Sequence, residues 1–147
     1  MRNLLAAFSV SFLLATPSWA VLGESVDSLA SDRQRLQGEI RSTVADGFTV
    51  HEISAADGTV VRQYGSPEGV IFAVSWQGPA VPDLAPLLGS YFVEFQQASS
   101  SPVRRRRPVV VQTDRLVVET GGHMRALRGR AYLKDAMPDS VSAAVVR

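Results

Sequence analysis

Alternating apolar and polar residues in the first half of the chain predict antiparallel strands. Phe48–Ile53 and Thr59–Tyr64 are rich in β-branched and aromatic side chains, and Asp57-Gly58 between them is typical of a tight turn. A second turn at 65–69 leads into Val70–Gln77, where larger side chains alternate with smaller ones. These three segments predict a β-meander.

The spacing of apolar residues then changes to that of an α-helix. Between Leu84 and Phe95 they recur every three or four residues, which places them on one face of a helix. Asp83 directly before this run is a typical N-cap, and Pro86 falls in the first turn, where its missing N–H is harmless. We expect this helix to bury its apolar face, Phe92 included, against the meander.

The second half of the chain returns to strand character. Strands are predicted at residues 109–112, 116–119 and 124–133. Gly121-Gly122 is expected to form the turn between the last two, and Gly129 a bulge or bend. The tail, Val141–Val146, is expected to add a last strand. The whole pattern predicts an α+β fold in which an antiparallel β-sheet, a meander plus a C-terminal hairpin, packs against an amphipathic helix.

The first twenty residues have the three parts of a signal peptide. Met1–Asn3 carries a positive charge, Leu4–Ala15 is an apolar run and Pro17–Ala20 supplies small residues for cleavage. An uncleaved anchor is the alternative, but a spanning helix needs about 20 apolar residues and Pro17 breaks this run earlier. We therefore expect cleavage of residues 1–20 and export to the periplasm or beyond it.

Residues 21–147 are expected to form one soluble domain. Helical spacing predicts a short helix over Ser25–Gln37, ahead of the meander. The chain has no cysteine, which excludes disulfides, a lipid-modified N-terminal cysteine and a thiol nucleophile. No later apolar stretch reaches the length of a membrane span. The domain must therefore be stabilised by its core.

Charge is distributed unevenly, although the chain as a whole carries a formal net charge of +1. Residues 21–103 hold four basic side chains against ten acidic ones, and residues 104–147 hold ten basic against four acidic. Two interpretations stay open: the two parts complement each other inside one domain, or the basic part meets an anionic partner.

A run of four arginines stands in a serine- and proline-containing loop near 98–108. It is a candidate anion-binding loop, made of Arg104, Arg105, Arg106 and Arg107. A solvated loop without a ligand is the alternative. No aromatic residue is interleaved with the run, so we expect no nucleic-acid partner.

Several short motifs after the leader resemble those of one family. They are Val50-His51-Glu52, Asp57-Gly58-Thr59 with Arg62 and Tyr64, Val70–Pro79, Pro82-Asp83-Leu84, Leu87-Leu88-Gly89, Gly121–Met124 and Gly129–Leu133. On these motifs the chain, from about Leu22 to its C-terminus, resembles small exported proteobacterial proteins known only as a domain of unknown function. The resemblance implies export and a shared fold, and it transfers no catalytic residue. The run at 104–107 is not part of that pattern.

Common catalytic motifs are absent from the sequence. There is no G-x-S-x-G elbow, no phosphate-binding G-x-x-x-x-G-K, no G-x-G-x-x-G and no H-E-x-x-H. His51 and His123 are the two histidines, and with Glu52 or Glu119 they would give a metal at most two imidazoles. We expect no metal and no cofactor, and ordinary structural roles for both histidines.

The first hairpin offers a candidate ligand-binding surface. If the turn around Asp57-Gly58 is of even length, His51 shares a face of the sheet with Arg62 and Tyr64, because side chains alternate along each strand. A titratable ring, a guanidinium and a phenol together suit an anionic or sugar-like ligand. The alternative is structural: Arg62 pairs with a carboxylate and Tyr64 packs.

These observations favour a non-catalytic, exported binding or assembly protein. Its partner would be another exported protein or an anionic component of the cell envelope. Two alternatives stay open: an enzyme that uses a polar cluster on the sheet, and a subunit of another exported protein.

N-terminal sequencing of the exported protein should start at Val21, because Ser18 and Ala20 are the small residues that follow the apolar run. A mature species that still carries Leu4–Ala15 would contradict this cleavage.

Overall fold

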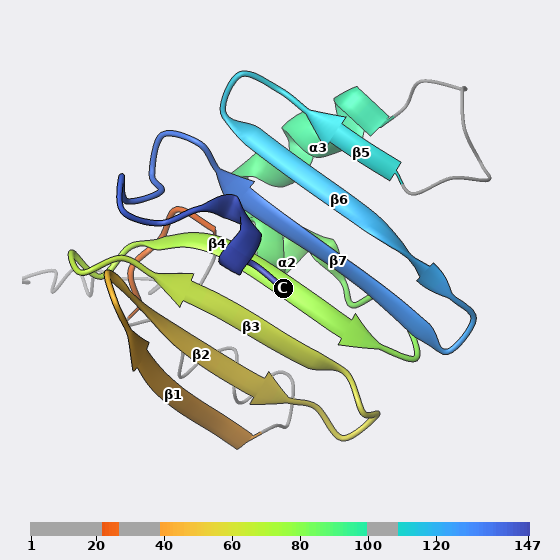
Figure 1. Cartoon of the computed structure of the whole chain (residues 1–147). Helices are drawn as coiled ribbons and strands as arrows, with labels where there is room; N and C mark the ends of the chain where they lie inside the picture. The colour runs from red at the N-terminus through yellow and green to blue at the C-terminus, as the bar shows by residue number, and fades with distance from the viewer. Residues whose placement is uncertain (1–21, 27–38, 100–108) are drawn as a thin grey trace, which may run out of the picture.

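The computed structural model describes residues 22–26, 39–99 and 109–147. In these residues seven strands form one sheet in the order β1-β2-β3-β4-β7-β6-β5, and every neighbouring pair is antiparallel (Figure 1). The strands are β1 (Glu39–Ala45), β2 (Phe48–Ser54), β3 (Val60–Gly65), β4 (Ile71–Gly78), β5 (Val109–Gln112), β6 (Leu116–His123) and β7 (Ala126–Leu133). The predicted α+β class, with an antiparallel sheet and a packed helix, is confirmed.

Helical segments between β4 and β5 cover one face of the sheet, which we call the helix face (Figure 1). They are α2 (Leu84–Leu88), the 3-10 turn η2 (Gly89–Tyr91) and α3 (Phe92–Ser99). The Asp83 carboxylate accepts a hydrogen bond from the N–H of Ala85 at 3.1 Å, as expected of an N-cap. The helix is interrupted because Gly89, at φ +52, leaves helical geometry.

The helix face carries the larger part of the core. Its buried residues are Leu22, Val61, Ile71, Val74, Trp76, Leu87, Leu88, Val111, Leu116, Val118, Ala131 and Leu133. Phe92 and Phe95 pack against this core, as expected of the apolar face of the helix, but they are only partly buried. The reason is that α3 lies against β5, a four-residue edge strand that covers little of it.

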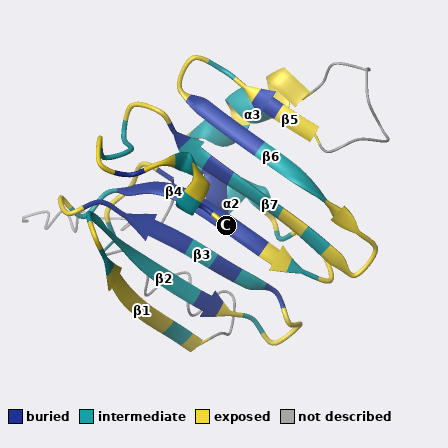
Figure 2. Ribbon diagram, viewed as in Figure 1, coloured by how far each residue is buried: buried dark blue, intermediate teal, exposed yellow. Residues whose placement is uncertain are grey.

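The opposite face, which we call the tail face, is crossed by residues 142–147, with the 3-10 turn η3 at Ala143–Val145 (Figure 1). Its buried residues are Tyr64, Phe72, Ala73, Val141 and Val146. A register shift opposite Tyr64 and Gly65 brings Phe72 to this face, where its ring centroid lies 6.3 Å from that of Tyr64. β4 is therefore buried on both faces from Ile71 to Trp76 (Figure 2).

β1 is a strand that the sequence analysis missed. It pairs with β2 through a turn at Asp46-Gly47, where Gly47 has φ +80. This Asp-Gly pair is the same turn signal as Asp57-Gly58. The strand itself gives a weak pattern because it lies at the edge of the sheet and most of its side chains are exposed (Figure 2).

Three details of the second half were predicted wrongly. Gly121-Gly122 lies within β6, and the chain turns at Met124-Arg125, where Arg125 has φ +67. Gly129 stays in register opposite Trp76, and a Cβ at Gly129 would lie 2.2 Å from the Trp76 ring, so close packing requires the glycine. The tail at 141–146 forms η3 instead of a strand, because side chains, and not a neighbouring strand, bind its main chain.

Some predictions lie outside the described residues. These are the leader at 1–20, residues 27–37 of the expected N-terminal helix and the arginine run at 104–107. Ser25, at the start of that expected helix, forms an isolated β-bridge with Val70. Within the described ranges, no helix has the length and apolar character needed to cross a membrane.

Gly129→Ala should lower the free energy of unfolding by about 1–3 kcal/mol, because the added Cβ would overlap the Trp76 ring. Gly58→Asn is the control, since nothing lies within 4 Å of its Cβ position and asparagine tolerates the φ of +87 there. Denaturant titration measures both losses. Equal losses in the two variants would contradict the required close packing.

Candidate anion-binding site

One row of paired residues crosses the tail face from edge to edge. Successive strand pairings give the row Arg41, Glu52, Arg62, Ser75, Arg130, Glu119 and Val110. These side chains share a face because directly paired residues of antiparallel strands point the same way. Cationic and anionic side chains therefore alternate on both sides of Ser75 in the central strand β4.

Two arginine–glutamate pairs flank Ser75. Arg62 Nε donates to Glu52 Oε2 at 2.8 Å, and Arg130 Nε donates to Glu119 Oε2, also at 2.8 Å. The hydrogen bond to Glu119 raises the pKa of Arg130, which keeps this guanidinium charged. Each pair uses the Nε atom of the arginine, so the terminal nitrogens remain available to other acceptors.

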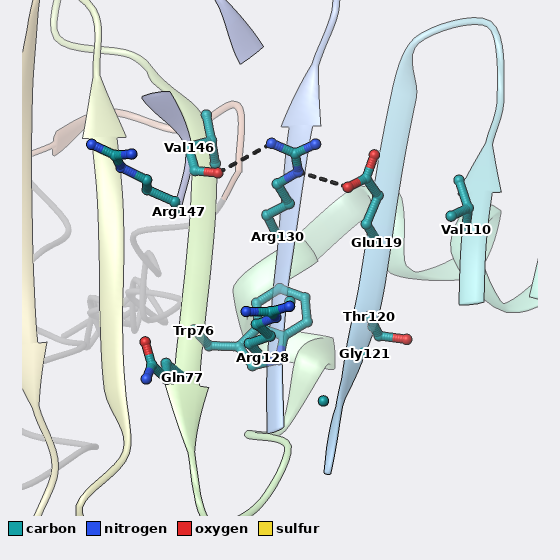
Figure 3. A pocket seen from close by; sticks show the side chains of 12 residues that line it. Trp76, Gln77, Val110, Glu119, Thr120, Gly121, Arg128, Arg130, Val146 and Arg147 are labelled. Carbon is teal, nitrogen blue, oxygen red and sulfur yellow. Dashed lines mark hydrogen bonds and ion pairs between the residues drawn. The ribbon is translucent and has the colours of Figure 1, made fainter. Parts of the chain in front are cut away.

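Arg130 uses a terminal nitrogen to hold the C-terminal segment on the sheet. Its Nη1 donates to the main-chain oxygen of Ala143 at 2.9 Å. It also donates to that of Val146 at 3.3 Å (Figure 3). The side chain of Val146 is meanwhile fully buried in the core of the tail face. Arg130 thus provides hydrogen bonds for the main chain of this segment at the point where the Val146 side chain is buried.

Tyr64 and Arg62 hold the end of the same segment. The Tyr64 hydroxyl donates to the main-chain oxygen of Arg147 at 2.8 Å and accepts from the N–H of Arg147 at 3.0 Å. Arg62 Nη1 donates to that oxygen at 3.4 Å. We call Arg62, Tyr64 and Arg130 the tail clamp.

A cavity of about 430 Å³, the first cavity, opens on the tail face beside the clamped segment (Figure 3). Arg128, Arg130 and Arg147 line it together with one acidic side chain, that of Glu119, which already pairs with Arg130. Arg128 projects to the tail face because it stands two residues before Arg130 in β7. In the part of the chain that the structure describes, the Arg128 guanidinium has no ion-pair or hydrogen-bond partner. The lining therefore carries an excess of positive charge.

A second cavity, of about 880 Å³, lies over the β1–β3 part of the tail face. Phe48 and Val50 are half-buried in its lining, and Arg41 stands at the β1 edge. Gln77 and Arg147 line both cavities. The two cavities therefore adjoin each other at the end of the clamped segment.

The structure brings two of the three predicted ligand residues to this face. Arg62 and Tyr64 lie on the tail face, whereas His51 lies on the helix face, because Glu52 is the residue that pairs with Arg62. The loop at 55–59 is odd in length, which shifts the register by one residue and reverses the face that His51 occupies. The prediction that His51, Arg62 and Tyr64 share one face of the sheet is therefore wrong. Arg62 and Tyr64 fit the structural alternative, since one pairs with a carboxylate and the other is buried.

The two histidines lie apart in the sheet. His51 belongs to β2 and His123 to the end of β6, and three strands separate β2 from β6. His51 Nδ1 lies 2.8 Å from the Ser42 hydroxyl, and burial lowers the pKa of His51, which favours its neutral form. Among the described residues, no group of three or more histidine or acidic side chains is arranged to hold a metal ion.

Sequence reasoning missed the arginines that line the first cavity. Arg128 and Arg130 alternate within a strand that was predicted, so a period-two reading of 124–133 would have put both on one face. Arg147 gave no such signal, because its position depends on contacts with distant side chains of the sheet.

Tyr64→Phe should loosen the tail, because both hydrogen bonds between the hydroxyl and Arg147 are lost while the ring stays in the core. We expect the unfolding free energy to fall by about 1–3 kcal/mol, and amide hydrogen exchange of residues 142–147 to accelerate. Tyr132→Phe is the matched control, since Tyr132 lies in the same register row and its hydroxyl has no hydrogen-bond partner among the described residues. Equal acceleration in both variants would contradict the clamp.

Comparison with known proteins places the chain in a family. It matches the model of a family described as "Protein of unknown function (DUF2844)" over residues 18–146. No curated protein and no solved structure matches the chain. The match confirms the resemblance to a domain of unknown function, and it includes every described strand and helix. The chain belongs to the DUF2844 family of proteins of unknown function.

Proposed function

We propose that this protein is an exported, non-catalytic binding protein whose first cavity takes an anionic ligand. The observation that carries the proposal is Arg128, a guanidinium without a described partner in a cavity that Arg130 and Arg147 also line. The carboxylate in that lining, Glu119, is already paired with Arg130. Guanidinium groups bind carboxylates and phosphates through parallel N–H donors, so a ligand with such a group would satisfy Arg128.

The ion pairs of the described residues support an anionic partner. Each pair joins two side chains of the same part of the chain, either before or after residue 104. These pairs are Arg62–Glu52, Arg115–Asp135 and Arg130–Glu119. Among the described residues, these ion pairs therefore give the basic side chains of residues 109–147 no acidic partner from the first part.

Export is part of the same proposal and is supported by the leader. Residues 1–20 combine a basic start, an apolar run and small residues before the expected cleavage. An exported protein meets the anionic components of the envelope and not the nucleic acids of the cytoplasm. The ligand would then be an anion of the envelope or of the surrounding medium.

An enzyme built on Ser42 and His51 is a second candidate. A serine hydroxyl 2.8 Å from a neutral imidazole is the pairing of a nucleophile with a general base. In the described part of the chain, however, no carboxylate binds His51, and neither residue lines either cavity. Labelling of Ser42 by a fluorophosphonate, lost in His51→Ala, would favour the enzyme over the binding protein.

Calorimetric titration of residues 21–147 with D-galacturonate should show saturable binding that weakens as salt is added. Arg128→Ala should weaken this binding about tenfold or more, because a charge-assisted hydrogen bond contributes about 1.5–3 kcal/mol. Arg125→Asn is the matched control: it removes the same charge from the neighbouring turn, does not line the cavity, and suits the φ of +67.

Equal weakening by the two variants would contradict an anion site at Arg128. So would the absence of saturable binding with both D-galacturonate and inorganic phosphate.

A further inference from the structure

We infer that the anionic ligand is a linear acidic polysaccharide, of the polyuronate kind, that lies across the tail face and occupies both cavities. This inference rests on the proposed binding function and specifies its ligand class. Four features of the tail face carry it: the continuity of the cavities, the distance between two arginines that have no partner among the described residues, the acceptors in the charged row and the apolar lining of the second cavity.

The two cavities form one path along the tail face. Arg147 and Gln77 line both of them, so a ligand that leaves the first cavity past these residues enters the second. Beside that path runs the charged row, from Arg41 at the β1 edge to Glu119 on β6. Ser75, at the middle of the row, is buried, so a chain-like ligand would pass it over Gln77 and Arg147, which join the two cavities.

Two arginine side chains lie far apart along this path. Arg128 lies on β7, and Arg41, which is exposed, lies on β1; neither has an ion-pair or hydrogen-bond partner within the described ranges. Four strand intervals separate β1 from β7 in the sheet, which is about 19 Å. A small anion cannot reach both, whereas a polymer with a negative charge on each unit can.

Acceptors in the row favour an acidic sugar over a phosphate polymer. Glu52 and Glu119 each bind an arginine through Oε2, so Oε1 of each remains free to accept a hydrogen bond from a ligand hydroxyl. A polyuronate brings hydroxyl donors together with carboxylates and suits a mixed row. A polyphosphate has no hydroxyl donors along its chain, so it would leave both Oε1 atoms without a hydrogen bond.

Apolar residues of the second cavity also suit a sugar chain. Phe48 and Val50 are half-buried in its lining and offer a surface for the C–H face of a pyranose ring. Nucleic-acid bases would need exposed aromatic rings to stack on. Tyr64, the other aromatic residue in this lining, is buried and is engaged by the tail.

Calorimetric titration of residues 21–147 with oligogalacturonates from monomer to hexamer tests the inference. The affinity should rise with chain length until the ligand reaches Arg41. Arg41→Ala should weaken the hexamer at least tenfold more than the monomer, whereas Arg128→Ala should weaken both. Arg125→Asn serves as the control for a lost positive charge, and the circular dichroism of each variant checks its fold.

The outcomes separate this inference from the proposed function. If Arg41→Ala leaves hexamer affinity unchanged while Arg128→Ala weakens monomer binding, the ligand occupies only the first cavity. The inference of a polysaccharide across both cavities would then be wrong, and the anion site at Arg128 would be retained. If Arg128→Ala has no effect on any oligomer, the proposed function fails as well. Tighter binding of inorganic hexaphosphate than of hexagalacturonate would overturn the assignment to an acidic sugar.

Discussion

Burial of β4 on both faces is the constraint on which the rest of this structure depends. Six consecutive residues, Ile71 to Trp76, are buried, so each face of the sheet needs its own cover. α2 and α3 supply that cover on the helix face. On the tail face the cover is a short segment of chain near the C-terminus, whose side chain at Val146 enters the core while its main chain remains polar. The fold therefore needs hydrogen-bond partners for that main chain, in a sequence without cysteine to tether it.

The tail clamp meets this need with side chains that also belong to the charged row or lie beside it. Arg62 and Arg130 reach the tail with their terminal nitrogens and are oriented by Glu52 and Glu119 at Nε. Each clamp arginine is thus partly neutralised by a glutamate of the neighbouring strand. The positive charge that a ligand would meet comes mainly from arginines outside the clamp, which explains why Arg128 and not Arg62 carries the proposed site.

The sequence predicted the parts of the fold that local signals specify. Asp57-Gly58, with alternating apolar and polar residues on either side, predicted the β2–β3 hairpin. Asp83, followed by apolar residues at helical spacing, predicted the start of the helix. Other predictions failed. The face that His51 occupies depends on the length of the loop between β2 and β3, and the position of the tail depends on side chains far away in the sequence. The packing of Trp76 on Gly129 likewise joins residues of two separate strands. Gly129, which was expected to form a bulge or bend, is instead the position where the Trp76 ring approaches the backbone of β7.

The central claim is that the tail face, and not the helix face, binds the ligand. Chemical-shift mapping of ¹⁵N-labelled residues 21–147 with hexagalacturonate tests this most directly. The account predicts that the largest changes fall on residues that line the two cavities, among them Gln77, Gly121 and Arg128 in the first and Thr43 and Val50 in the second. Changes confined to α2, α3 and the helix face, or no saturable change at all, would contradict it.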